Sequence, residues 1–242
     1  MGKAKGVVDI VFLMDATESM QKCIDKLKEN IKMFIAAMLG TAERPTVIRH
    51  WRAKVVGFRD YEADGKRWLE DNAFTSDVND LCLQLDELKA EGGGDVPESL
   101  LDAIYKVGMM EETALEESFS PAMWRPRGQA ARIMVAFTDA SFHEPMTIPE
   151  ANGGTVDDVI NLIHSRRLLL SVYAPRYDAE SRLIQSDYIR LTAADRAEYI
   201  PLIDGAGNDI SLDEFTEDAE NFQDTLLQLA RTITETAVVE TL

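Results

Sequence analysis

An apolar run near the amino terminus, residues 7–14, constrains the fold of this chain more than any other segment. All of its residues except Asp9 are apolar, and most are β-branched or long. Such a run is typical of a strand that is buried on both faces, as in a parallel sheet covered by helices. The run ends at a carboxylate, Asp15, and the hydroxyl-bearing Thr17 and Ser19 follow at alternating positions. Three side chains with oxygen atoms that could bind a metal therefore lie at the junction between a strand and a helix.

Oxygen-only donor sets suit hard divalent cations. Mg²⁺ binds about six oxygens in a near-octahedral shell at about 2.0–2.1 Å, and a carboxylate with two hydroxyls on one turn supplies part of that shell. The alternative is that Asp15 only caps the following helix. Two later segments favour the cation site: the glycine-rich loop that holds Asp95, and Asp139, which directly follows another predicted strand.

Strand and helix patterns alternate along the whole chain. After the first strand, strands are predicted at residues 53–58, 66–70, 132–138, 168–173 and 198–203, and helices at 20–39, 77–89, 97–107, 155–166, 181–194 and 213–237. This alternation predicts an α/β fold with a doubly wound, mainly parallel sheet flanked by helices on both faces. Such sheets bind ligands beyond the carboxyl ends of their strands, where Asp15, Asp60 and Asp139 are expected to project.

The charge balance narrows the range of partners. Lys and Arg total 25 against 43 Asp and Glu, a net charge of −18, which argues against binding to nucleic acid or to anionic membranes. A chain of 242 residues with 45% hydrophobic residues suits one domain spanning residues 1–242. No stretch approaches the ~20 apolar residues of a membrane span, and Cys23 and Cys82 fall on apolar helix faces. We therefore expect a cytoplasmic protein without disulfides.

The sequence lacks the motifs of the enzyme classes that are common on such sheets. The sequence contains no GxGxxG after a strand, no GxxxxGK[ST] and no GxSxG. The enzyme alternative that stays open is Mg²⁺-dependent phosphoryl transfer, with Asp15 as nucleophile and Asp139 holding the ion. Such an aspartate usually needs a second acid to protonate the leaving group, and the position two residues on is Thr17. We therefore expect a protein without catalytic residues.

Three segments carry a resemblance to a known family. The buried strand ending in DATES, the loop GGGDVPES and the strand ending in FTDA resemble, in order and spacing, the three loops of a von Willebrand factor type A domain with its metal-ion-dependent adhesion site. The resemblance covers essentially the whole chain. It implies a Rossmann-like fold and a non-enzymatic module that binds Mg²⁺ or Mn²⁺ and accepts a carboxylate from a partner protein at the open coordination position.

The resemblance also implies a ligand set. The first loop of the family reads Asp-x-Ser-x-Ser, which corresponds here to Asp15, Thr17 and Ser19, and Thr17 keeps the hydroxyl while adding a methyl group. Asp95 occupies the second-loop position, where the family often has threonine, and Asp139 occupies the third. Three carboxylates would over-neutralise a divalent ion, so either Asp95 binds through water or the module uses another kind of ligand.

Two further segments extend the resemblance toward intracellular members of the family. They are GFRDY and the stretch WRPRGQAARIMVAFTDASFHEP. Some of those members accompany kinases and phosphatases, which implies a role in an intracellular signalling or stress-response complex. His143 follows Asp139 by four residues, so it could lie at the border of the metal site. A histidine in a loop is, however, more often not a metal ligand.

Overall fold

The computed structural model describes residues 6–93, 96–114 and 117–239. Its strands are β1 (Val7–Asp15), β2 (His50–Phe58), β3 (Leu69–Asp71), β4 (Ala131–Phe137), β5 (Leu168–Ala174) and β6 (Ala197–Pro201). They form one six-stranded sheet in the order β3-β2-β1-β4-β5-β6. β1 pairs in parallel with both β2 and β4, β5 and β6 continue in parallel, and β3 pairs antiparallel with β2. The predicted mainly parallel sheet is confirmed.

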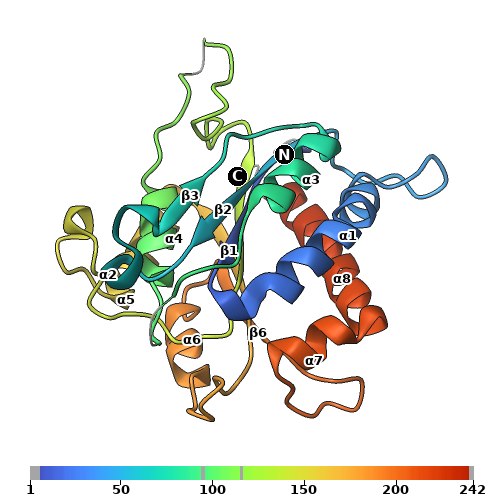
Figure 1. Ribbon diagram of the computed structural model, residues 1–242. Coiled ribbons are helices and arrows are strands. Elements are labelled where there is room, and N and C mark those ends of the chain that lie inside the picture. The colour runs from blue at the N-terminus through green and yellow to red at the C-terminus, as the bar shows by residue number, and fades with distance from the viewer. Residues whose placement is uncertain (1–5, 94–95, 115–116, 240–242) are drawn as a thin grey trace.

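Helices cover both faces of this sheet (Figure 1). They are α1 (Gln21–Leu39), α2 (Tyr61–Asp64), α3 (Val78–Glu87), α4 (Leu100–Gly108), α5 (Val156–Arg166), α6 (Gln185–Leu191), α7 (Leu212–Glu217) and α8 (Ala219–Val239), with 3-10 turns at Glu18–Met20, Gly65–Arg67 and Pro149–Ala151. α1, α3, α7 and α8 lie on one side of the sheet, and α4, α5 and α6 lie on the other. No helix in these ranges combines the length and apolar character that a membrane crossing needs.

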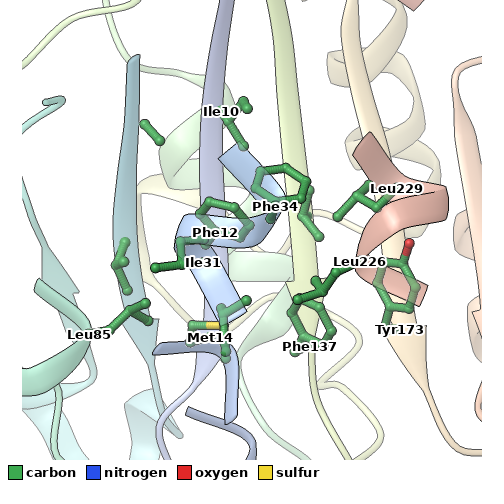
Figure 2. Packing of buried hydrophobic residues seen from close by; sticks show 14 of the residues in the cluster. Ile10, Phe12, Met14, Ile31, Phe34, Leu85, Phe137, Tyr173, Leu226 and Leu229 are labelled. Carbon is green, nitrogen blue, oxygen red and sulfur yellow. The ribbon is translucent and has the colours of Figure 1, made fainter. Parts of the chain in front are cut away.

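The central position of β1 in the sheet explains why the amino-terminal run has apolar residues on both faces. Ile10, Phe12 and Met14 face the layer of α1 and α8, whereas Val11 and Leu13 face the layer of α4 and α5. Figure 2 shows the first set packed against side chains of α1, α3, α8 and the neighbouring strands. Because β1 lies in the middle of the sheet, both of its faces lose water on folding, and an alternating polar pattern would leave polar groups buried.

The amino-terminal boundary of β2 differs from the prediction. β2 begins at His50, three residues before the predicted start, because the charged Arg52 gives no apolar signal; the predicted strand already included the charged Lys54. Both side chains are nevertheless buried, since Arg52 pairs with Asp9 and Lys54 pairs with Asp71. A buried cation that is paired can occupy a strand, but it gives no hydrophobic signal in the sequence.

Two predicted helices were too long, and a third is interrupted. α4 begins at Leu100 and not at residue 97, because the backbone of Glu98 runs alongside Phe142 as a strand-like bridge. The helix predicted at 181–194 is limited to α6, since Ser181 has a φ of 61°. The final helix is two helices, because Asp218 leaves the helical conformation and its carboxylate accepts a hydrogen bond from the Asn221 amide in a new first turn.

Candidate functional site

The carboxyl ends of β1 and β4 meet where the strand order reverses. From β1 the chain continues to β2 on one side, whereas β4 pairs with the other side of β1. Asp15 is the last residue of β1, and Asp139 follows β4 by two residues. Met14 is opposite Phe137 in the register, so the two carboxylates follow neighbouring strand ends. Ligand sites of doubly wound sheets lie at this position.

Asp15 is fully buried and is fixed by three hydrogen bonds. Its Oδ1 accepts the backbone N–H of Thr17 at 3.0 Å and the Thr17 hydroxyl at 2.7 Å, and its Oδ2 accepts the Thr138 hydroxyl at 2.8 Å. A carboxylate oxygen can accept two hydrogen bonds, so Oδ2 keeps accepting capacity. Thr138, which follows β4 directly, therefore ties the first predicted loop to the third.

The Thr17 and Ser19 hydroxyls lie close together on the turn after Asp15. Thr17 donates its hydrogen to Asp15, and Ser19 lies beside Asp139, whose pKa it lowers. Their oxygens lie 3.5 Å apart. This separation is smaller than the roughly 4.2 Å between two opposite ligands of one Mg²⁺ ion, so both oxygens can reach the same cation. Ser19 is exposed and Asp139 is partly exposed, which leaves this group accessible from solvent.

The electrostatics of the two aspartates favour a cation. Burial, followed by repulsion from Asp139, raises the pKa of Asp15 to about 7. Burial also raises the pKa of Asp139, although the hydrogen bond from Ser19 opposes this shift. Two neighbouring carboxylates with raised pKa values lack compensation, and a divalent ion between them would supply it. The donor set thus fits a hard cation of the Mg²⁺ or Mn²⁺ type.

Glu98 adds a third carboxyl group that the sequence analysis did not select. It is 3% exposed, and its Oε2 has no hydrogen-bond partner among the described residues. Burial, and then the charges of Asp15 and Asp60, raise its pKa to about 9. Its backbone is held between the N–H of His143 and the carbonyl of Ser141. Its position inside the GGGDVPES segment was the available signal, but that segment does not indicate which carboxyl group is buried.

Asp60 and His143 lie beside this group. Asp60 follows β2, as predicted, and caps α2 by accepting the Glu62 amide at 2.9 Å. His143 Nε2 lies 3.1 Å from Asp60 Oδ1, so the histidine interacts with a strand-end carboxylate at the edge of the site.

The second predicted loop is only partly described. Asp95, which the family resemblance assigns as a ligand, lies outside the described residues. The preceding Gly93 packs directly on the first loop with a φ of +74°, and a Cβ atom there would lie 2.6 Å from Thr17 Cγ2. A glycine is therefore required for the two loops to approach this closely.

Arg59 binds the backbone of both of these loops. Its buried guanidinium donates to the carbonyls of Ala16, Arg67, Lys89 and Glu91 and pairs with Glu70 at 2.7 Å. Ala16 belongs to the first loop, and Lys89 and Glu91 lead into the second. One side chain at the end of β2 thus connects the backbones of both loops.

The site does not have the composition of a carboxylate-rich or histidine-rich metal centre. Among residues 6–93, 96–114 and 117–239, no group of three or more His, Cys, Asp or Glu side chains is arranged to hold a metal ion. The arrangement described above instead combines two carboxylates, Asp15 and Asp139, with the hydroxyls of Thr17 and Ser19.

Comparison with known proteins bears on this geometry. Residues 9–120 match the family model of the von Willebrand factor A domain. This match supports a von Willebrand A domain, and it runs from β1 to the connection before β4. It includes Asp15, Thr17, Ser19 and Asp95, and it ends before Asp139. No curated protein sequence matches the chain.

Solved structures resemble the fold of this chain at low sequence identity. Proximal thread matrix protein 1 from the mussel byssus is 11% identical with a TM-score of 0.52. A second crystal form of that protein gives 12% identity and a TM-score of 0.49. Each alignment covers 95% of this chain and 47% of the mussel protein, so this chain spans about half of its length. These similarities concern the fold alone.

Proposed function

We propose that this chain is a protein-interaction module that binds Mg²⁺ or Mn²⁺ and uses the ion to engage a partner protein. The observation that carries the proposal is the pair of poorly compensated carboxylates, Asp15 and Asp139, beside the hydroxyls of Thr17 and Ser19, whose oxygens lie 3.5 Å apart. The von Willebrand A domain match over residues 9–120 supports an interaction role.

In this proposal Thr17 and Ser19 bind the ion through their hydroxyl oxygens. Asp15, Asp139 and Asp95 provide the negative charge, directly or through water. Thr138 keeps Asp15 in position, and the partly exposed Asp139 and exposed Ser19 leave an approach from solvent. A bound ion would supply a local positive charge for a partner carboxylate. Oxygen donors disfavour Zn²⁺, which prefers His and Cys.

Calorimetric titration with Mg²⁺ and Mn²⁺ tests the metal part. We expect one binding event in the wild type and none in the Asp15→Ala, Asp139→Ala double variant. Asp224→Asn is a matched control, because Asp224 is an exposed aspartate on α8 and should leave binding unchanged. Equal binding by the wild type and the double variant would exclude this site.

The net charge of −18 restricts the partner. A carboxylate is attracted only at short range, where the ion outweighs the acidic surface, so we expect the partner to present one carboxylate in a neutral or basic surround. An affinity capture with Mg²⁺ should retain such a partner on the wild type. The same partner should be lost with a chelator and on the Asp15→Ala variant. Retention under all three conditions would contradict a metal-bridged contact.

Phosphoryl transfer through Asp15 is the alternative activity. Asp15 is fully buried and both of its oxygens accept hydrogen bonds, which disfavours attack on a bulky phosphate ester. A phosphatase assay with Mg²⁺ tests this alternative. Turnover that disappears in Asp15→Asn while the fold persists would replace the interaction module with an enzyme.

A further inference from the structure

A second group of charged side chains lies at the other end of the central strands, beyond their amino ends. A cleft with a volume of about 480 Å³ opens beside the amino ends of β1 and β2 and the connection that leads into β4. Its walls include Arg49, His50, Trp51, Phe119 and Arg125. We call it the amino-edge cleft. Its volume falls within the range of small-molecule sites, roughly 300–1,000 Å³.

Arg125 is the buried cation of the cleft, and it is incompletely paired. The buried Asp9 carboxylate lies near its guanidinium, with a distance of 3.3 Å from NH1 to Oδ1. The same carboxylate accepts two better hydrogen bonds from Arg52, at 2.9 Å and 2.8 Å. One carboxylate therefore serves two guanidiniums, and Nε and NH1 of Arg125 have no hydrogen-bond partner among the described residues. This edge keeps an excess of positive charge.

The position of Arg125 is fixed by its backbone. Its N–H donates to Asp9 at 2.8 Å, and its carbonyl accepts two hydrogen bonds from Arg132, whose guanidinium also pairs with Glu112 at 2.7 Å. These contacts fix the backbone of Arg125 at the cleft, and its guanidinium lies between the Asp9 carboxylate and the Phe119 ring. A rigid planar donor of this kind suits the two oxygens of a carboxylate or phosphate group.

The remaining walls combine exposed cations with apolar surface. Arg49 and His50 are exposed, and no ion pair within the described ranges involves either side chain. Phe119 is 49% exposed and lies over the Arg125 guanidinium at 5.3 Å, and Trp51 is half-buried beside it in the cleft wall. Exposed aromatic surface next to cations suits a ligand with a flat apolar body and one anionic group.

We propose that the amino-edge cleft binds a small organic anion whose carboxylate or phosphate meets Arg125 and Arg49 and whose apolar body lies on Phe119 and Trp51. A large polyanion does not fit this proposal, because the net charge of −18 repels it at long range. The cleft is also independent of the metal-binding proposal, since it lies at the opposite ends of β1 and β4.

Calorimetric titration with benzoate, phenyl phosphate and the uncharged benzamide tests this cleft in metal-free buffer. Benzoate or phenyl phosphate should bind at one site, and benzamide should bind at least tenfold more weakly than benzoate. The tighter of the two anions identifies the preferred acid group. Addition of Mg²⁺, or the Asp15→Asn substitution, should leave these affinities unchanged.

Variants locate the binding. Arg125→Gln should abolish it, and the exposed-residue variants Arg49→Gln and Phe119→Ala should weaken it at least threefold even if Arg125→Gln fails to fold. Arg44→Gln is the control, because Arg44 is an exposed arginine outside this cleft. Equal affinity for benzoate and benzamide, or wild-type affinity in both Arg49→Gln and Phe119→Ala, would overturn the proposal.

Discussion

At the amino ends of the central strands, Asp9 is buried between Arg52 and Arg125, whereas at their carboxyl ends Asp15 faces Asp139 and Glu98. Both groups are buried, but they are compensated differently. At the amino ends, the Asp9 carboxylate is compensated by two cations within the fold, which leave one positive charge in excess. The carboxyl groups of Asp15, Asp139 and Glu98 have raised pKa values, so their ionised forms are unfavourable in the folded state. Removing a buried charge that the fold compensates should lower stability, whereas buried charge that the fold leaves uncompensated indicates a ligand site.

The largest expected effect is at the amino edge. Asp9→Asn removes the one negative charge that Arg52 and Arg125 share, and the buried guanidiniums lose their counter-ion. We expect a loss of about 3–5 kcal/mol in the free energy of unfolding, measured by urea denaturation. Asp224→Asn on the exposed face of α8 is the control. A loss below about 1 kcal/mol would mean that Asp9 does not compensate this edge.

The second effect concerns the carboxyl edge with metal present. At a Mg²⁺ concentration about 100 times its Kd, the unfolding free energy should rise by about 2.7 kcal/mol, because the ion binds the folded state. Thermal unfolding with and without Mg²⁺ measures this gain. The Asp15→Ala, Asp139→Ala variant should show none of it. The same gain in both proteins would place the stabilising ion elsewhere.

The third effect, ranked by its size per pH unit, is a pH dependence that Glu98 contributes. Its pKa rises from 4.5 to about 9 in the folded state, so between these values the folded chain binds a proton that the unfolded chain lacks. Stability should therefore fall as pH rises through this window, by at most about 1.4 kcal/mol per pH unit. Glu98→Gln should flatten the profile obtained from denaturation at pH 5 to 9. An unchanged slope would mean that Glu98 is ionised in the folded protein.

The smallest effect has the opposite sign to that of Asp9→Asn. Asp139→Asn removes one of two repelling carboxylates, so the metal-free protein should gain about 0.5–1 kcal/mol of unfolding free energy. Urea denaturation in metal-free buffer compares the two asparagine variants directly. If both variants lost stability, the contrast between the two edges would be wrong.

Local sequence signals predicted the central strands and the placement of several site residues. The run 7–14 is apolar because β1 is buried on both faces, and Asp15 and Asp139 follow strand ends that such runs mark. The contacts of Thr17 with Asp15 and with Ser19 are equally local, because all three residues lie on one turn. These features depend on neighbours in the chain, so the sequence contains them.

Other features depend on contacts between distant segments and had no local signal. Thr138 reaches Asp15 across 123 positions, and the backbone of the buried Glu98 is held by residues that follow β4. Asp9 was an exception in an apolar run, and its partner Arg125 lies in a connection without periodicity. The metal ion and the role of Asp95 stay predictions.

The contacts of the Arg59 guanidinium lower the entropy that the loops lose when a ligand binds. It binds the carbonyls of Ala16, Lys89 and Glu91, so the backbones on which the first two loops are built lose their freedom during folding. A ligand that arrives later does not bear that ordering cost, which leaves more of its contact energy as affinity. Loops are usually the variable part of a fold, but these two are joined through one side chain at the end of β2. A change in the length of either loop would therefore displace the other.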